Sequence, residues 1–508
     1  MEMFGLPHDL YYCLCILLAL VVLRTKLGAG RNPRQKLPPG PWRLPVIGSL
    51  HHLLRGLPHR TMRDLSLRHG PVMLLRVCER VVFVISSAEA AREVFTGHGT
   101  AFDQRPSSPG IEEIMRGGMG VLFAPYGEQW RQLRRIIVTE LLSVRRVGEF
   151  RRIREEEAAR LAASLSSSSA SGRLVVNVDE LLAAFVADSS VRAIFSDRLP
   201  ETAAFQRLVR QGTELSTAFN LRDLFPTSRL VGMLPRSRKA ELYGQDLFRH
   251  IDDIIRHHEE RRKTAGDEYR EQDMIDVLLR IQKDDDMRVI LTPGVLRAVL
   301  ADVFGAAFDT ATSTLQWAMA ELIANPRVME KTQLEVRRVL AGQERVSEAA
   351  LSGTHYLKAV IKETLRLHPP SPLVTRACVD DQKVQGYDVP KGTILAINAW
   401  AISRDPRHWE HPDRFMPERF EGEHALDFKG LDFEFTPFGA GRRICPGINF
   451  AHANVEICLA TLLYHFDWEL PAGAKPEELD MTEHFGLSVR RKSQLLLRPI
   501  PRIPLVDG

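Results

Sequence analysis

FGAGRRICPG, residues 438–447, places a single thiol among three glycines near the C-terminus of this 508-residue chain. The glycines can adopt backbone conformations that are closed to other residues, so a large flat ligand can approach the main chain. Arg443 adds a fixed cation two residues before Cys445, and amides left free by such a loop can donate to the sulfur and stabilise a thiolate. The loop holds no second Cys or His, so it suits an axial haem ligand better than tetrahedral zinc. The alternative is a glycine-rich turn with a buried cysteine.

The complete spacing F-x-x-G-x-R-x-C-x-G resembles the haem loop of the cytochrome P450 superfamily, and the chain as a whole resembles its plant microsomal type. The resemblance implies a mostly α fold, in which one large helical domain with small β-sheets buries a haem b between a long helix and this loop. Cys445 would then bind the iron as an axial thiolate. Cofactor contacts within the loop would also come from Phe438, Gly439, Arg443 and Gly447.

The composition is that of an ordinary globular protein, with 44% hydrophobic and 26% charged residues. A chain of this length can bury a large core, and length alone would suggest two or three domains. The net charge of +4 is too small to indicate nucleic-acid binding, and no basic block is interleaved with aromatic residues. Six sparse, irregularly spaced cysteines argue against a disulfide framework and for a reducing compartment.

The N-terminal segment carries an uncharged apolar run, Leu10–Leu23, which acidic residues precede and basic residues follow. A cleaved signal peptide is an alternative, but it would carry its basic residues before the apolar region. The charge order therefore favours a retained single-pass anchor, with the N-terminus in the lumen and the rest of the chain in the cytosol. By resemblance, the membrane is that of the endoplasmic reticulum. Residues 1–36 would be the anchor and its basic flank, 37–45 a proline-rich hinge, and 46–508 a haem-thiolate catalytic domain.

Gln129–Leu142 carries apolar residues at helical spacing, which places Trp130 and Arg134 on one face of a predicted helix. Taken alone, the pair would suggest a core tryptophan beside a surface arginine. It also resembles the W-x-x-x-R of the family's haem-propionate helix, and Arg376 aligns with a further propionate-binding arginine. By resemblance, the pair would neutralise two propionates together with Arg376 and Arg443 through charge-assisted hydrogen bonds.

Two stretches rich in β-branched residues, Val72–Leu75 and Val81–Ile85, predict a small antiparallel sheet. Ser164–Gly172 is nearly all Ser, Ala and Gly, so its composition predicts a mobile surface loop. Helical patterns dominate most of the remaining sequence.

Pro293 opens a long helical pattern that ends near Asn325-Pro326. Its centre, residues 306–310 (AAFDT), puts an acid beside a hydroxyl in apolar surroundings, where neither is stable unless it is paired. The Thr310 hydroxyl could donate to the carbonyl of Ala306, and such a bond often bends a helix and opens a local groove. The simpler alternative is a back-bonded threonine beside an aspartate at the helix surface.

The same five residues resemble the oxygen-activating A-G-x-D-T motif of the family, so Asp309 and Thr310 would deliver protons during catalysis. Three positions depart from that pattern. Ala307 stands where glycine is usual, Phe308 where plant members have threonine, and Ala311 where serine or threonine is common. The acid and the alcohol remain, which favours monooxygenation, but the width and water content of the groove stay open.

Glu363 and Arg366 stand three residues apart on a predicted helix that ends at His368-Pro369-Pro370, so both project from one face. Together with Arg419 they resemble the family's structural triad, a buried ionic network behind the haem loop. Removing one member of such a network strands a buried charge at roughly 3 to 5 kcal/mol. We therefore expect these residues to serve folding and haem retention rather than specificity.

The resemblance also predicts which side chains line the distal pocket, and none of them can ionise. Such a pocket rewards burial of hydrocarbon at about 25 cal/mol per Å², whereas a charged metabolite would enter it unpaired. A terpenoid is therefore the favoured substrate, with a phenolic or indole-derived metabolite as the alternative. The predicted pocket residues are Ile114, Met115, Val121, Phe219, Phe304, Ala307, Phe308, Leu373, Val374, Phe485 and Leu487.

These resemblances imply a monooxygenase that inserts one atom of O2 into an apolar plant metabolite. No flavin or nicotinamide motif is readable, so electrons would come from NADPH through a cytochrome P450 reductase in the same membrane. Arg131, Arg135, Arg145 and Arg146 would offer that partner a cationic docking surface, the alternative being a plain solvated surface. Rival functions are a haem-thiolate isomerase or dehydratase, against which the acid–alcohol pair argues, and a non-catalytic haem binder.

Overall fold

The computed structural model describes residues 35–115, 119–170, 175–196, 208, 211–212, 215, 220–235, 237–266, 269, 271–284, 291–422, 425–471 and 473–503. The predicted anchor Leu10–Leu23 and the pocket candidate Phe219 lie outside these residues. No helix within the described ranges is both long and apolar enough to span a bilayer.

The chain divides into two compact units. Unit 1 takes its described residues from Met1–Ser107, Phe219–Leu234 and Leu373–Ala401. Unit 2 takes its residues from three further segments and contains most of the helices; these segments are Ser108–Ala218, Pro235–Pro372 and Ile402–Gly508.

Unit 1 is built around a four-stranded sheet with the strand order β1-β2-β7-β4. β1 and β2 form an antiparallel pair, which confirms the predicted sheet, while β2 and β7 run parallel. Apolar side chains of β1 and β2 pack against Met62 and Leu65 of α3. The elements of unit 1 are α2 (Leu50–Leu53), α3 (Pro58–His69), β1 (Val72–Val77), β2 (Arg80–Ile85), α4 (Ala88–Thr96), α11 (Leu221–Leu224), α12 (Arg229–Gly232), β4 (Leu373–Ala377), β5 (Gln382–Val384), β6 (Tyr387–Val389), β7 (Ile394–Asn398) and the start of α18 (Ala399–Ile402).

Unit 2 is mostly helical, with two small sheets of orders β3-β11-β8 and β10-β9. Its helices are α5 (Pro109–Ile114), α6 (Glu128–Ile136), the π-helical turn η1 (Ile137–Leu141), α7 (Val144–Glu149), α8 (Arg151–Ala170), α9 (Val178–Phe195), α13 (Arg238–Ala265), α14 (Met274–Lys283), α15 (Pro293–Ala324), α16 (Pro326–Val339), η3 (Ala350–Gly353), α17 (His355–Leu367), η4 (Pro417–Phe420), η5 (Gly441–Arg443), α19 (Ile448–His465) and η6 (Pro476–Glu478). Its strands are β3 (Val176–Asn177), β8 (Phe466–Glu469), β9 (Glu483–His484), β10 (Arg490–Arg491) and β11 (Leu496–Pro501).

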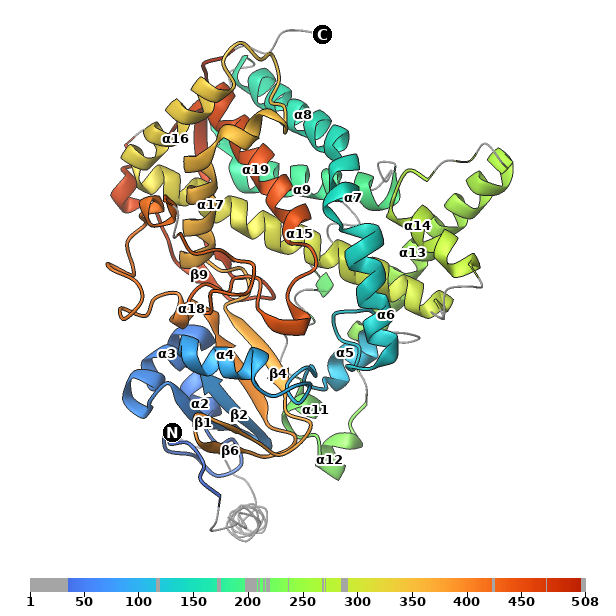
Figure 1. Cartoon of the computed structure of the whole chain (residues 1–508), viewed down its shortest axis with the longest axis vertical. Coiled ribbons are helices and arrows are strands. Elements are labelled where there is room, and N and C mark those ends of the chain that lie inside the picture. Colours follow the sequence, from blue (N-terminus) through green and yellow to red (C-terminus); the bar gives the residue numbers. More distant parts are fainter. Residues whose placement is uncertain are drawn as a thin grey trace, which may run out of the picture. The chain divides into compact units, whose positions relative to one another are not determined.

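Helix α15 runs through unit 2 beside α9, α17 and α19 (Figure 1). Thr292 caps its first turn by accepting an amide hydrogen (O···N 3.3 Å), and Pro293 occupies the first helical position, where a missing N–H is harmless. The helix ends at Ala324, because Pro326 disfavours helical backbone at the preceding Asn325. The predicted long helix is therefore confirmed.

Helix α8 continues to Ala170, so the loop predicted for Ser164–Gly172 is wrong as far as residue 170. Serine is only moderately unfavourable in a helix, and extending a helix that already exists needs little free energy. Leu165 is fully buried in this part of α8, which ties the serine-rich turns to the core of unit 2.

Candidate functional site

The Cys445 loop is closed by backbone hydrogen bonds that depend on two glycines. Gly439 and Gly441 have φ angles of 69° and 71°, in the left-handed region that other residues rarely adopt. The amide of Cys445 donates to the carbonyl of Phe438 (3.0 Å), which closes the loop just before α19 begins. Gly447 has an ordinary φ of −90°, so its role is not conformational; its amide hydrogen donates to the Cys445 sulfur.

Cys445 differs from the other cysteines that the structure describes. Cys78, Cys378 and Cys458 are buried packing residues, whereas Cys445 keeps part of its surface exposed. Protein atoms packed around the sulfur raise the pKa of the Cys445 thiol, while the Gly447 amide and the charge of Arg134 act in the opposite direction. Cys445 is thus the described thiol that is both accessible and stabilised by nearby donors.

Helix α6 and the loop place three donors around the cysteine. Arg134 donates to the carbonyl of Ile444, and the guanidinium of Arg443 lies 4.5 Å from the centre of the Trp130 ring. The Trp130 indole N–H donates to the Val121 carbonyl (2.9 Å). No described carboxylate lies within ion-pair distance of Arg134, and burial lowers the pKa of its guanidinium. Arg443 also donates from its Nη2 to the Ala124 carbonyl (2.7 Å). An accessible thiol beside two guanidinium groups fits an iron porphyrin with two propionates.

Arg376 belongs to unit 1, where it lies on β4. Its side chain is buried, its Nη1 donates to the neighbouring Thr375 carbonyl (3.0 Å), and its guanidinium lies 5.4 Å from the centre of the Phe95 ring. Leu373 and Val374 lie on the same strand. The haem-contact role of Arg376 and the pocket roles of its two neighbours stay predictions.

Helix α15 is buried along most of its length, and beyond Pro293 its residues are most exposed near its centre, which we call the opening. Ala306 is exposed, and Gly305, Ala307 and Thr310 are partly exposed. The hydroxyl of Thr310 donates to the carbonyl of Ala306 (2.8 Å), so the predicted back-bond is confirmed. The opening therefore presents small side chains and one hydroxyl whose oxygen can still accept a hydrogen bond.

Asp309 does not share this opening. Its side chain is buried and forms an ion pair with Arg490 of β10. One carboxylate oxygen is taken up by that pair, and the other, Oδ2, is buried without a hydrogen-bond partner. The acid and the hydroxyl expected to act together thus contact different parts of unit 2.

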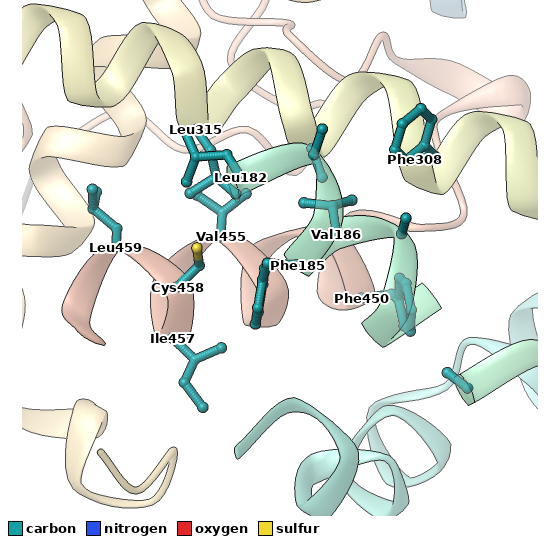
Figure 2. Close-up of a cluster of buried hydrophobic side chains, with 14 of the residues drawn as sticks. Leu182, Phe185, Val186, Phe308, Leu315, Phe450, Val455, Ile457, Cys458 and Leu459 are labelled. Atoms are coloured by element: carbon teal, nitrogen blue, oxygen red, sulfur yellow. The ribbon is translucent and has the colours of Figure 1, made fainter. Parts of the chain in front are cut away.

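Phe304 and Phe308 lie in the core of unit 2 rather than in the opening. Both rings are almost fully buried, and they stack on each other with centroids 6.2 Å apart. In Figure 2 the Phe308 ring lies in the same cluster as Val186 of α9 and Leu315 of α15. Their burial differs from the expectation that they line a pocket, because residues 304 and 308 occupy a different face of α15 from Ala306 and Thr310.

The remaining pocket candidates in unit 2 are divided between the core and the surface. Ile114 and Met115 are buried in its core, and Val121 packs against that core from a partly buried position. Phe485 is partly exposed and Leu487 is 44% exposed, both in the turn between β9 and β10.

The predicted ionic network is present and fully packed. Arg366 binds both oxygens of Glu363, with Nε–Oε2 at 2.7 Å and Nη2–Oε1 at 2.8 Å, and neither side chain is exposed. Arg419 adds a bond from its Nε to Glu363 Oε1 (3.2 Å). Arg366 also donates to the carbonyls of Ser403 and Pro412, both at 2.7 Å. The network ties α17 to η4 and to the segment before it, as a structural role requires.

Sequence reasoning missed Asp302, a buried acid two turns before Thr310. Its Oδ2 accepts the amide hydrogen of Leu122 (2.8 Å), and a side chain at Gly120 would meet this oxygen at 2.3 Å. Burial raises the pKa of the Asp302 carboxyl to about 7, because only one hydrogen bond offsets the lost water. The signal available in the sequence was an acid within an apolar helix.

Comparison with known proteins gives consistent matches over nearly the whole chain. The model of the family described as cytochrome P450 matches residues 38–497. A desmethyl-deoxy-podophyllotoxin synthase of Sinopodophyllum hexandrum is 44% identical over 505 residues, covering 98% of this chain and 97% of the relative. A dolabradiene monooxygenase of Zea mays is 41% identical over 499 residues, covering 97% and 98%. A solved zebrafish cytochrome P450 with abiraterone, 24% identical, has a TM-score of 0.72 over 88% of this chain and 99% of that one, which supports the fold alone.

Proposed function

The chain belongs to the cytochrome P450 family, whose members are haem-dependent monooxygenases, and we propose that it inserts one atom of O2 into an apolar plant metabolite of the terpenoid class. The observation that carries this proposal is the pair of features within unit 2: an accessible thiol among cationic donors, and a hydroxyl at the opening of α15. A non-catalytic haem binder needs the first feature but not the second.

Cys445 would be the iron ligand, held by the left-handed glycines of its loop and by the Gly447 amide. Trp130, Arg134 and Arg443 would bind the propionates. When bound, the haem supplies the iron at which dioxygen is activated with electrons from NADPH. Because the Thr310 hydroxyl donates its hydrogen to the Ala306 carbonyl, its oxygen would accept a hydrogen bond from water on the open side and so hold that water, the proton source, at the opening. We keep Asp309 as a second proton-handling residue, acting through its unpartnered Oδ2.

The terpenoid class rests on the apolar character of the predicted pocket and on one relative. The dolabradiene monooxygenase is named for a diene, which offers no charge to recognise. The podophyllotoxin-type relative is more similar to this chain, so phenolic substrates remain the competing class. Among the described residues, the four that form the opening, Gly305, Ala306, Ala307 and Thr310, carry no ionisable group. Asp302, one turn before Ala306, is buried and accepts the Leu122 amide hydrogen, and Asp309 pairs with Arg490. The opening itself therefore favours an uncharged substrate in either case.

Electrons would come from a membrane-bound NADPH-dependent reductase that docks on a cationic surface of unit 2. Arg131 pairs with Glu128, and Arg146 is mostly buried in pairs with Glu149 and Glu271. Arg135 is exposed and has no acidic group within ion-pair distance among the described residues, and Arg145 is 86% exposed although it lies 3.8 Å from a carboxylate oxygen of Glu149. We therefore assign most of the docking to Arg135 and Arg145.

We also propose that residues 1–36 anchor the protein in the endoplasmic reticulum membrane, with the catalytic domain in the cytosol. Deleting these residues should leave the haem domain foldable and move most of the protein off microsomes. Undiminished membrane residence of the truncated protein would contradict the proposed anchor.

Reconstitution with a plant NADPH reductase tests the function. We expect the wild type to give the family's reduced carbon-monoxide band and to consume NADPH when terpenes are added. Cys445→Ala should lose both, whereas Cys458→Ala, which removes a fully buried thiol, should keep both. Turnover of a pre-oxidised substrate without reductase would instead indicate an isomerase or dehydratase, and a haem spectrum without any turnover a haem binder.

A further inference from the structure

One face of α15 holds a short segment of chain beside the opening. Three side chains at four-residue spacing, Asp309, Ser313 and Trp317, contact the Val489 carbonyl and the Arg490 guanidinium. Ser313 Oγ donates to the Val489 carbonyl (2.8 Å), and the Trp317 indole N–H donates to the same oxygen (3.0 Å). All three side chains are at most 2% exposed. One carbonyl oxygen thus receives two buried donors from one helix.

The other polar group of Val489 is also fixed. Its amide donates to the carbonyl of Pro370 (2.9 Å), just beyond the end of α17. The Trp317 ring is itself clamped, because it stacks on His368 with centroids 3.8 Å apart and planes 4° from parallel. His368 Nε2 lies 2.6 Å from Glu321 Oε1, which orients the imidazole. The indole N–H therefore has a defined direction, towards Val489.

Val489 belongs to the hairpin 483–491, in which β9 and β10 pair. Each strand has only two residues, so the pairing cannot fix the position of the hairpin by itself. The turn between the strands carries Phe485 and Leu487, two apolar side chains that stay partly exposed. Its position relative to the opening of α15 is set by the contacts of Val489 and Arg490.

We propose that Ser313 and Trp317 are specificity-determining positioning residues that act through the Val489 carbonyl. By fixing Val489 they set where Phe485 and Leu487 stand relative to Ala306 and Thr310, and so limit the size of the ligand that fits there. Neither residue touches the ligand. The specificity role rests on the proposed function, because it concerns the ligand of that site. The hydrogen bonds that fix the hairpin at Val489 do not depend on any ligand.

Hydrogen–deuterium exchange of the full-length protein tests the hold without reference to haem. Trp317→Phe keeps the ring and removes the N–H, and Ser313→Ala removes only the hydroxyl. Both variants should speed exchange of residues 483–491 by about threefold to tenfold, the factor expected when one hydrogen bond is lost. Matched controls are Trp468→Phe, whose indole donates to the Leu462 carbonyl (3.1 Å), and Ser189→Ala, whose buried hydroxyl donates to Asn454 (2.8 Å). The controls should leave exchange of this hairpin unchanged.

Azole binding to the holoenzyme, followed by the shift in haem absorption, tests specificity. Imidazole is small enough to bind the iron without contacting the pocket residues. Clotrimazole is bulky, so its affinity depends on contacts with the residues that line the pocket. We expect each variant to raise the Kd for clotrimazole by about threefold to tenfold and to change that for imidazole by less than about twofold.

Faster exchange with an unchanged ratio of the two Kd values would overturn the specificity role. Unchanged exchange would show that the hydrogen bonds of Ser313 and Trp317 do not fix the hairpin. If Trp317→Phe failed to fold, Ser313→Ala would decide both arms. A wild type that takes up no haem would overturn the proposed function, and the specificity role with it, while the exchange result would still decide the hold.

Discussion

The rings of Phe304 and Phe308 lie nearly parallel on α15, with centroids 6.2 Å apart and planes 4° from parallel. Phe195 of α9 continues the stack, with its centroid 6.0 Å from that of Phe304. Residues four apart share a helix face, so this face of α15 belongs to the core, while Ala306 and Thr310 share the open one. A bulky residue in the centre of the motif therefore stabilises the helix without narrowing the opening.

Phe308→Ala should destabilise the protein and leave its product pattern unchanged. Removing a fully buried phenylalanine typically costs about 3 to 5 kcal/mol, because the cavity collapses only in part. Ala307→Leu, which adds bulk at a partly exposed neighbour, should instead change product ratios with little effect on stability. Denaturant unfolding and product analysis of both variants check this. A shifted product ratio in Phe308→Ala at full stability would place that ring in the pocket.

Local motifs explain how much of the site could be predicted. The Cys445 loop, the long helix and the Glu363–Arg366 pair each depend on residues close together in the sequence, so spacing alone locates them. The Thr310 back-bond spans one helical turn and was predictable for the same reason. Geometry that depends on a single turn or loop can be predicted from the sequence without knowledge of the tertiary structure.

The parts that could not be predicted depend on distant partners. Asp309 and Arg490 are 181 residues apart, and no spacing rule joins them. The direction of Phe308 depends on which face of α15 packs against α9, and both faces are apolar in sequence. The hydrogen bonds of Ser313 and Trp317 to Val489 could not be predicted either. Their acceptor is a backbone carbonyl, which every residue carries, so the sequence does not identify it.

Glu363→Gln should destabilise the protein by roughly 3 to 5 kcal/mol and reduce haem retention. The substitution keeps the shape of the side chain but leaves the buried charges of Arg366 and Arg419 without their counter-ion. Glu421→Gln is the matched control, since Glu421 pairs with Lys331 at a site where both side chains are more than 40% exposed. Such exposed pairs contribute about 0 to 1 kcal/mol. Equal losses in the two variants, measured by denaturant unfolding, would contradict a buried network.

Asp302 should make stability depend on pH in a defined direction. Burial raises the pKa of its carboxyl from 3.8 to about 7, so the folded chain binds the proton more tightly than the unfolded chain. The stabilisation from this proton is complete below about pH 4 and is lost as the pH rises towards about 7. Asp302→Asn keeps an acceptor for the Leu122 amide but removes the titration. Relative to this variant, the wild type should lose about 2 kcal/mol between pH 5.5 and 8, since one pKa unit corresponds to about 1.4 kcal/mol. Parallel pH profiles for the two proteins, from denaturant unfolding, would contradict the assignment.

Thr310→Ala should keep the fold and the haem but separate NADPH consumption from product formation. The hydroxyl of Thr310 is partly exposed at the opening of α15, and the alanine variant leaves no side-chain hydroxyl there to hold the water that supplies protons. We expect the yield of product per NADPH to fall about tenfold or more, with the balance released as peroxide, and Thr310→Ser to restore most of it. Thr314→Ala is the matched control, because Thr314 back-bonds one turn further along the same helix (2.9 Å) but is buried, so its loss should leave coupling unchanged. Full coupling in Thr310→Ala would move proton delivery to another group. The buried Asp309 would be the first to examine, and Asp309→Asn, measured by the same peroxide and product assays, would show whether its unpartnered oxygen carries the step.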